Sequence, residues 1–242
     1  MTRRAVRWLG PWWGVLLMLV GVAVGVSAGL WQVNRAAYKQ ELEARFAAGE
    51  AGGALPLLVT DENAGESRYR VIRVSGRYDA KRQVLLDNIS SQGRPGYQVL
   101  TPFRTGEGTV LVNRGWLPAN GDRRVLPDIQ VGEEPREVLG CIELLPQPGI
   151  TLAAVPPDAA SAWPRRLLFP TAAQVSAQLG TSLRSYQLLL DPSAPDGYQR
   201  AWQPGGMGPD RHRGYAVQWF GLALTVVVIY LVLVIRNGKQ AP

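Results

Sequence analysis

The sequence predicts a two-helix membrane hairpin that carries one antiparallel, β-rich domain of the α+β type, for which a barrel is one candidate architecture. Residues 8–34 and 214–235 contain no charged side chain, and each run is longer than the roughly 20 apolar residues that cross a ~30 Å hydrocarbon core. The segment between them has the charged composition of a globular domain and contains short β-like stretches separated by turn residues.

The basic residues mark the membrane borders. Residues 36–210 hold 18 Lys and Arg against 19 Asp and Glu, so the net charge of +7 comes from eight basic residues that flank the spans. These are Arg3, Arg4, Arg7, Arg35, Arg211, Arg213, Arg236 and Lys239. The net charge therefore gives no support to nucleic acid as a partner, and we expect none.

The same basic residues predict the topology. Those before the first span and after the second place residues 1–11 and 236–242 in the cytoplasm by the positive-inside rule. The three arginines on the opposite side weaken this bias, but a long loop is translocated largely regardless of its charge. We therefore expect the domain to lie outside the cytoplasm.

The first membrane helix is predicted over residues 12–34. A cleaved signal peptide is the alternative, since residues 26–28 form an acceptable cleavage site and Arg3-Arg4 resembles a twin-arginine signal. However, the 27-residue uncharged run is much longer than a signal core. Trp12 and Trp31 are also ~28 Å apart along a helix, which suits two interfacial aromatic belts. We expect the span to be retained.

One face of this helix lacks side chains. Gly21, Gly25 and Gly29 recur at every fourth residue, a pattern that permits close approach of another helix. The second span, predicted over 212–235, offers Gly221, Ala223 and Thr225 as partners. Homodimerisation through the same face is the alternative.

The domain is predicted over residues 35–191. It begins with a helical extension, Ala36–Ala48, which Gly52-Gly53 and Pro56 end. A second short helix follows Pro170, because Thr171 and Gln174 form a capping box and Gly180 supplies a C-terminal cap. The predicted strands are Tyr69–Arg77, Gln83–Asn88, Tyr97–Arg104, Thr109–Trp116, Glu137–Leu145 and Leu183–Asp191.

Short gaps between strands, such as Gly106–Gly108, favour antiparallel hairpins. Two Pro-rich stretches, Leu145–Pro164 and Pro192–Pro209, are predicted as loops. The second belongs to a tether, residues 192–211, that joins the domain to the second span.

The residue inventory argues against several kinds of chemistry. Cys141 is the only cysteine and His212 the only histidine, which excludes an intramolecular disulfide and a Cys/His zinc site. A hydrolase needs an imidazole beside its nucleophile, and no serine lies in a nucleophile-elbow context. A carboxylate metal site stays open, although no spacing suggests one. We expect a protein that is not an enzyme.

His212 is the one residue suited to bind a prosthetic group. If the spans pair antiparallel, Trp31, Gln32 and Arg35 of the first span meet the start of the second at the same depth. There His212 is joined by three further candidates, Arg213, Tyr215 and Trp219. An imidazole, flat aromatic rings and arginines suit a heme, whose iron, macrocycle and propionates they would contact. The alternative is a membrane border of aromatic and arginine side chains without a ligand.

Four blocks of the sequence resemble the Surfeit locus protein 1 (Shy-type) family of cytochrome c oxidase assembly factors. They run in family order from the end of the first span to the start of the second. The blocks are GLWQVNRAAYK (29–39), YRVIRVSGRY with VLLDN (69–78 and 84–88), GYQVLTP with VLVNRGWLP (96–102 and 110–118) and HRGYAVQWF (212–220). Residues 133–186 carry little of the resemblance.

The resemblance implies an inner-membrane factor, here in a bacterial plasma membrane with its domain facing the periplasm or exterior. Its partner would be the oxidase core subunit, with heme a supply machinery as a further candidate. It implies that His212 is an axial ligand of heme a, while Asn113–Trp116 would form a structural turn or a partner-contact edge. A heme-free scaffold that stabilises the core subunit is the alternative function, and a pigment spectrum of the purified protein would separate the two.

Overall fold

The computed structural model describes residues 12–56, 59–145 and 162–239. The predicted cytoplasmic N-terminus (1–11), most of the first Pro-rich loop (146–161) and the last three residues of the predicted tail (240–242) lie outside the described residues. The chain forms two compact units: the two terminal helical segments, up to Ala44 and from Pro204, and the sheet domain, Arg45–Gln203.

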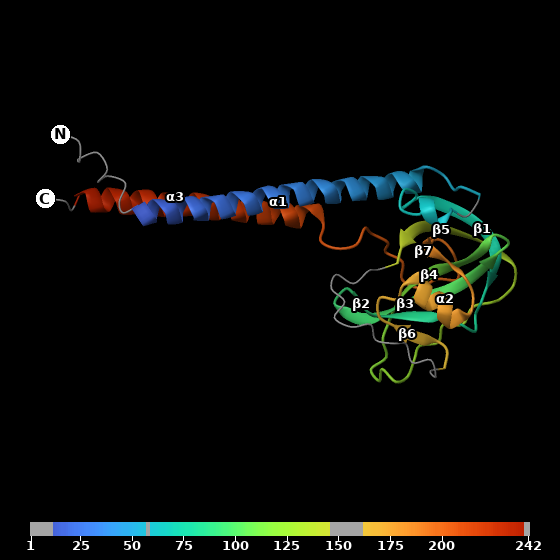
Figure 1. Ribbon diagram of the computed structural model, residues 1–242. Helices are drawn as coiled ribbons and strands as arrows, with labels where there is room; N and C mark the ends of the chain where they lie inside the picture. Colours follow the sequence, from blue (N-terminus) through green and yellow to red (C-terminus); the bar gives the residue numbers. More distant parts are fainter. Residues whose placement is uncertain (1–11, 57–58, 146–161, 240–242) are drawn as a thin grey trace. The chain divides into compact units, whose positions relative to one another are not determined.

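The helical unit contains two long helices, α1 (Trp12–Ala51) and α3 (Pro209–Lys239), which lie side by side in Figure 1. Their 40 and 31 residues correspond to ~60 Å and ~46 Å, so both are long enough to cross a ~30 Å hydrocarbon core. Both are also apolar enough to span a membrane. The predicted span 12–34 and the predicted extension Ala36–Ala48 are one continuous helix. Pro209, predicted as the end of a loop, instead opens α3, where its missing N–H costs no helical hydrogen bond.

The glycine face of α1 packs against α3. A Cβ atom at Gly21 would contact Val226, one at Gly25 would contact Ala223, and one at Gly29 would overlap Phe220. Residue numbers rise on α1 as they fall on α3, so the helices are antiparallel. The prediction that α3 is the partner is confirmed, and Ala223 lies in the contact. Gly221 does not, because open space surrounds its Cβ position.

The sheet domain contains seven strands among the residues that the structure describes. They are β1 (Val71–Tyr78), β2 (Val84–Ser91), β3 (Arg94–Thr105), β4 (Gly108–Pro118), β5 (Arg136–Leu144), β6 (Arg165–Leu167) and β7 (Leu183–Leu190), with helix α2 (Ala172–Leu179) before β7 and a single 3-10 turn, η2 (Asp61–Asn63), before β1. The strand order is β1-β5-β7-β4-β3-β2-β6. The end of β1 also pairs with the end of β3, so five of the strands close into a small barrel.

The barrel closes where β1 passes from β5 to β3. Gly76 pairs with Arg136 of β5 and with Thr105 of β3, and a side chain there would overlap the carbonyl oxygen of Arg104. Next to this seam, Asp79 accepts hydrogen bonds from Arg104 and Arg82 at 2.6 and 2.8 Å. Burial opposes ionisation of Asp79, but these hydrogen bonds outweigh it and lower the pKa of its carboxyl.

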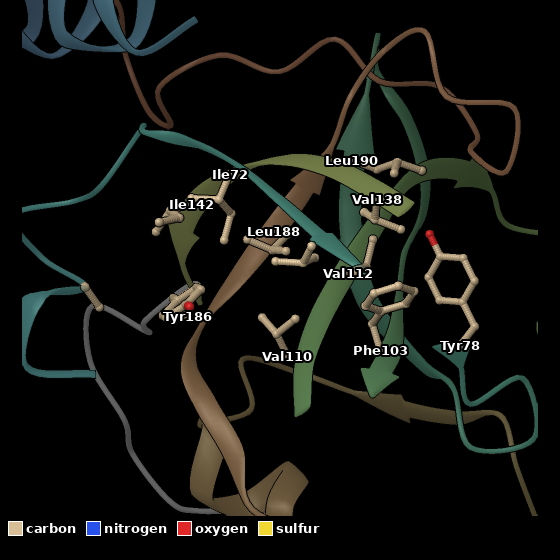
Figure 2. Packing of buried hydrophobic residues seen from close by; sticks show 12 residues of the cluster. Ile72, Tyr78, Phe103, Val110, Val112, Val138, Ile142, Tyr186, Leu188 and Leu190 are labelled. Atoms are coloured by element: carbon tan, nitrogen blue, oxygen red, sulfur yellow. The ribbon is translucent and has the colours of Figure 1, made fainter. Parts of the chain in front are cut away.

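Alternate residues of the barrel strands fill its interior. Figure 2 shows Ile72, Val112, Val138, Leu188 and Phe103 pointing toward one another from five different strands. Helix α2 covers the face of β2, β3 and β4 that points away from this interior cluster. Its Val175 and Leu179 are buried among Val84, Leu100 and Leu111. The domain therefore has apolar packing on both sides of β4, which explains why this strand is buried along most of its length.

The predicted fold class is confirmed, with two details that the sequence did not show. The six predicted strands are present, and α2 has the predicted capping box and a left-handed Gly180 cap. However, β4 pairs parallel with β7, and β2 pairs parallel with the unpredicted strand β6. Both parallel partners lie far along the chain, so the short gaps between neighbouring strands could not indicate them.

Asn113–Trp116 lie inside β4 and not in a turn. The buried guanidinium of Arg114 donates to the carbonyl oxygens of Ile129, Gln130 and Asp196, and its burial lowers its pKa. Gly115 has a positive φ, +111°, and a Cβ there would lie 2.8 Å from the carbonyl oxygen of Gln199. This segment ties two loops to the barrel, the β4–β5 connection and the chain that follows β7, which is a structural role.

We predict that Gly25→Leu separates α1 from α3, because its Cβ would lie 2.9 Å from that of Ala223 and 3.1 Å from the carbonyl oxygen of Trp219. Such overpacking costs about 1–3 kcal/mol. The Cβ position of Gly21 lies 3.9 Å from the Cβ of Val226, which suits a disulfide. In a chain with Cys141→Ser, Gly21→Cys and Val226→Cys, Gly25→Leu should slow disulfide formation several-fold. Gly221→Leu is the control and should leave it unchanged; equal rates in both variants would contradict this packing.

We predict that Arg114→Met destabilises the sheet domain by about 2 kcal/mol or more. The substitution removes the donor to the carbonyl oxygens of Gln130 and Asp196 and one of the two donors to the buried carbonyl oxygen of Ile129. Thermal unfolding of the full chain in detergent, followed by its β-sheet circular dichroism, measures the effect. Arg124→Met removes an arginine whose side chain is 91% exposed and should change the midpoint little. Similar midpoints for both variants would show that the Arg114 contacts are dispensable.

Candidate functional site

The candidate site lies within the helical unit, where the first turn of α3 faces the middle of α1. His212 is 7% exposed, and its Nδ1 lies 2.6 Å from Oε1 of Gln32. The ring of Trp31 stands edge-on to the imidazole, with centroids 6.5 Å apart and an interplanar angle of 86°. The glycine contact between the helices brings these residues together, because Gln32 lies one turn beyond Gly29 on the same side of α1.

The second nitrogen of the imidazole is free. Among the residues that the structure describes, Nε2 of His212 has no hydrogen-bond partner, and it is not one of the fully buried atoms that lack a partner. Nε2 is therefore not completely buried, although the histidine as a whole is only 7% exposed. A histidine that binds a metal ion usually has one ring nitrogen bonded to a protein group and offers the other, unpartnered nitrogen to the metal.

Polar contacts hold the segment before His212 against α1. Nζ of Lys39 donates to the carbonyl oxygen of Gly205 at 2.6 Å. Arg213 donates to Oε1 of Gln40 and to Oδ1 of Asp210, both at 2.7 Å. These contacts fix the position at which α3 begins and so fix the depth of His212.

The other predicted site residues surround the imidazole less closely. Trp31 and Tyr215 are 59% and 42% exposed, so each offers a free aromatic face. Trp219 is half-buried and lies two helical turns from His212. The guanidinium of Arg35 lies 5.2 Å from the centre of the Tyr38 ring. The structure thus brings Gln32, Trp31 and His212 together, while Arg35 and Arg213 have local partners.

Sequence reasoning did not identify Lys39 and Gln40 as part of this region. A signal was present, because both lie about two helical turns beyond Gln32 and therefore on the side of α1 that faces α3. Gly205, the partner of Lys39, lies in the segment that was predicted as a tether, and no periodicity indicates what a loop carbonyl will contact.

The chemistry of these residues fits a heme better than a bare metal ion. Among the described residues, no group of three or more His, Cys, Asp and Glu could hold a metal ion. A heme needs only one or two protein ligands, because the macrocycle supplies the other nitrogens. The free Nε2 of His212 could bind the iron, and the exposed faces of Trp31 and Tyr215 could pack on the ring. The exposed guanidiniums of Arg35 and Arg213 could pair with propionates.

Comparisons with known proteins identify the relatives of this chain. A family model described as the SURF1 family matches residues 19–224, which include the candidate-site residues on both helices. Surfeit locus protein 1 of Xenopus tropicalis is 33% identical over 153 residues, covering 53% of this chain and 47% of that protein. SURF1-like proteins of Rickettsia bellii and Rickettsia felis are 26% and 25% identical, covering 89% and 90% of this chain and 88% and 95% of theirs. The chain spans about half the length of the vertebrate relatives it matches.

Proposed function

The chain belongs to the SURF1 family, and from this premise we propose that it is a membrane-bound assembly factor for cytochrome c oxidase that binds heme a and aids its delivery to the nascent core subunit. The oxidase role rests on the family resemblance of the blocks between residues 29 and 220. The heme role rests on one observation: in the chain's only histidine, Nδ1 is bonded to Gln32 and Nε2 has no partner among the described residues. We propose a carrier and not an enzyme.

Each site residue would contact a different part of the heme. His212 would hold the iron through Nε2, while Trp31, Tyr215 and Trp219 would present apolar surface to the macrocycle. Arg35 and Arg213 would pair with the propionates, and both would have to leave their present local partners to do so. When bound, heme a would be the cargo; the protein would orient it and shield it. A single protein ligand on a partly exposed surface suits a group that must later be released.

A heme-free scaffold is the second candidate, and a specific observation favours it. The hydrogen bond between His212 and Gln32 is already a sufficient reason for a buried histidine at a helix contact. Under this hypothesis, His212 only joins α1 to α3, and the helix pair stabilises the nascent core subunit by contact.

The proposal includes a topology in which both helices span a bacterial plasma membrane and the sheet domain lies outside the cytoplasm. The length and hydropathy of α1 and α3 and the basic residues at both termini support it. We expect N-terminal sequencing of the purified membrane protein to show that the first span is retained, and we expect the C-terminal tail to resist protease added outside spheroplasts. A mature N-terminus near Gly29, or a tail cut from outside, would contradict this topology.

We predict that His212→Asn abolishes or sharply changes the heme a absorption of protein purified from a host that produces heme a. An asparagine amide can still donate to Gln32 from the position of Nδ1, but it places no nitrogen at the position of Nε2. His212→Ala, which removes both, is the companion variant. Membrane insertion should be unchanged in each, because the apolar spans are intact.

The same pair of variants separates the two candidate functions. Under the heme hypothesis, His212→Asn and His212→Ala lose the pigment and lower the oxidase level equally. Under the scaffold hypothesis, His212→Asn keeps the bond to Gln32 and the oxidase level, and only His212→Ala lowers it. An unaltered heme spectrum in His212→Asn would contradict ligation by this residue.

A further inference from the structure

We propose that Gln32 is a positioning residue: its side-chain oxygen holds the ring hydrogen of His212 on Nδ1 and so selects Nε2 as the atom that meets a ligand. This inference rests on the proposed function for the identity of the ligand. The geometry of the pair is independent of it, since the 2.6 Å contact joins two residues of the helical unit without any bound group.

The chemistry of the two side chains determines which ring nitrogen of His212 carries the hydrogen. The atom of Gln32 that faces the ring is Oε1, and an amide oxygen only accepts hydrogen bonds. Nδ1 must therefore donate, which in the neutral imidazole leaves the lone pair on Nε2. With the hydrogen on Nε2 instead, two acceptors would face each other at 2.6 Å, which is unfavourable at a partly buried site.

The surroundings of the pair hold the ring in one orientation. The histidine is 7% exposed and its ring lies nearly perpendicular to the ring of Trp31, so it cannot turn freely about its side-chain bonds. Gln32 is itself held in the contact between α1 and α3, two turns beyond Gly25. A ligating histidine normally donates its other N–H to a fixed acceptor, which orients the ring and raises its basicity, and loss of that acceptor typically costs 10- to 100-fold in metal affinity, in rough terms.

The single histidine of this chain makes the tautomer directly measurable. In full-length protein carrying 15N-labelled histidine and a tag without histidine, the two ring nitrogens of His212 are the only labelled imidazole nitrogens. Nitrogen NMR of the heme-free protein in lipid should show the hydrogen on Nδ1 and an unprotonated Nε2. A hydrogen on Nε2 in the wild-type protein would overturn the proposal, whether or not heme binds.

Three variants assign the effect to the side-chain oxygen. Gln32→Leu removes the acceptor and should give a mixture of tautomers, with about 10- to 100-fold weaker heme a binding. Gln32→Glu keeps an acceptor oxygen and should retain the wild-type tautomer and bind heme a within a few-fold of wild type. Asn34→Leu removes an amide at the same depth from the opposite side of α1 and should change neither measurement. An unchanged tautomer in Gln32→Leu would overturn the role of Gln32.

These outcomes are distinct from failure of the proposed function. If heme a binds, its addition should shift the Nε2 signal and leave the hydrogen on Nδ1. Suppose that the wild-type protein shows the expected tautomer, that Gln32→Leu loses this tautomer, and that no heme binds at any concentration. The positioning role of Gln32 would then stand, and heme carriage would be wrong. The engineered disulfide between residues 21 and 226 reports whether each variant still forms the helix pair.

Discussion

The close approach of α1 and α3 determines the rest of the candidate site. Because Gly25 and Gly29 have no side chains, the helices come near enough for Ala223 and Phe220 to contact the backbone of α1. In a bilayer, the hydrophobic effect does not drive two helices together, and such packing supplies much of the association. The same approach places Gln32 within 2.6 Å of His212. A wider separation would leave the imidazole without its partner.

This arrangement connects the chain's composition to its proposed role. A protein with one histidine and one cysteine cannot enclose a metal ion in a site of several Cys and His ligands. It can, however, add one axial ligand to a cofactor that brings its own macrocycle. The site offers one free nitrogen beside exposed aromatic and guanidinium groups, and it contains polar side chains that already have local partners. Such a site would hold a cofactor less firmly than a closed pocket, as transfer to another protein requires.

The sheet domain is held together by closure of the barrel and not by helix packing. Closure pairs strand edges that would otherwise be exposed. Five strands form a barrel whose seam requires Gly76 and is reinforced by Asp79 with Arg104. Short β-like stretches between turn residues predicted six of the strands, and the capping box predicted α2. The three-residue strand β6 carries too little periodicity to predict. The β4–β7 pairing depends on the path of the chain between them, which local patterns do not encode.

The site was partly predictable for similar reasons. The antiparallel pairing and the common depth of Gln32 and His212 follow from the glycine spacing and the positions of the two uncharged runs. The choice of Gln32 as the partner of Nδ1 depends on the rotation of each helix, which a single sequence does not fix. The partners of Arg35 and Arg213 were easier to predict, because Tyr38 and Asp210 each lie three residues away on the same helix.

Electron–nuclear double resonance on the ferric, heme a-bound protein would test the central claim most directly. With 15N-labelled histidine in the protein and unlabelled nitrogen in the macrocycle, His212 is the only labelled ligand that the chain can offer. We predict a strongly coupled 15N signal from a nitrogen bound to the iron, in addition to the macrocycle nitrogens. Bound heme a whose strongly coupled nitrogens are all unlabelled would contradict the account.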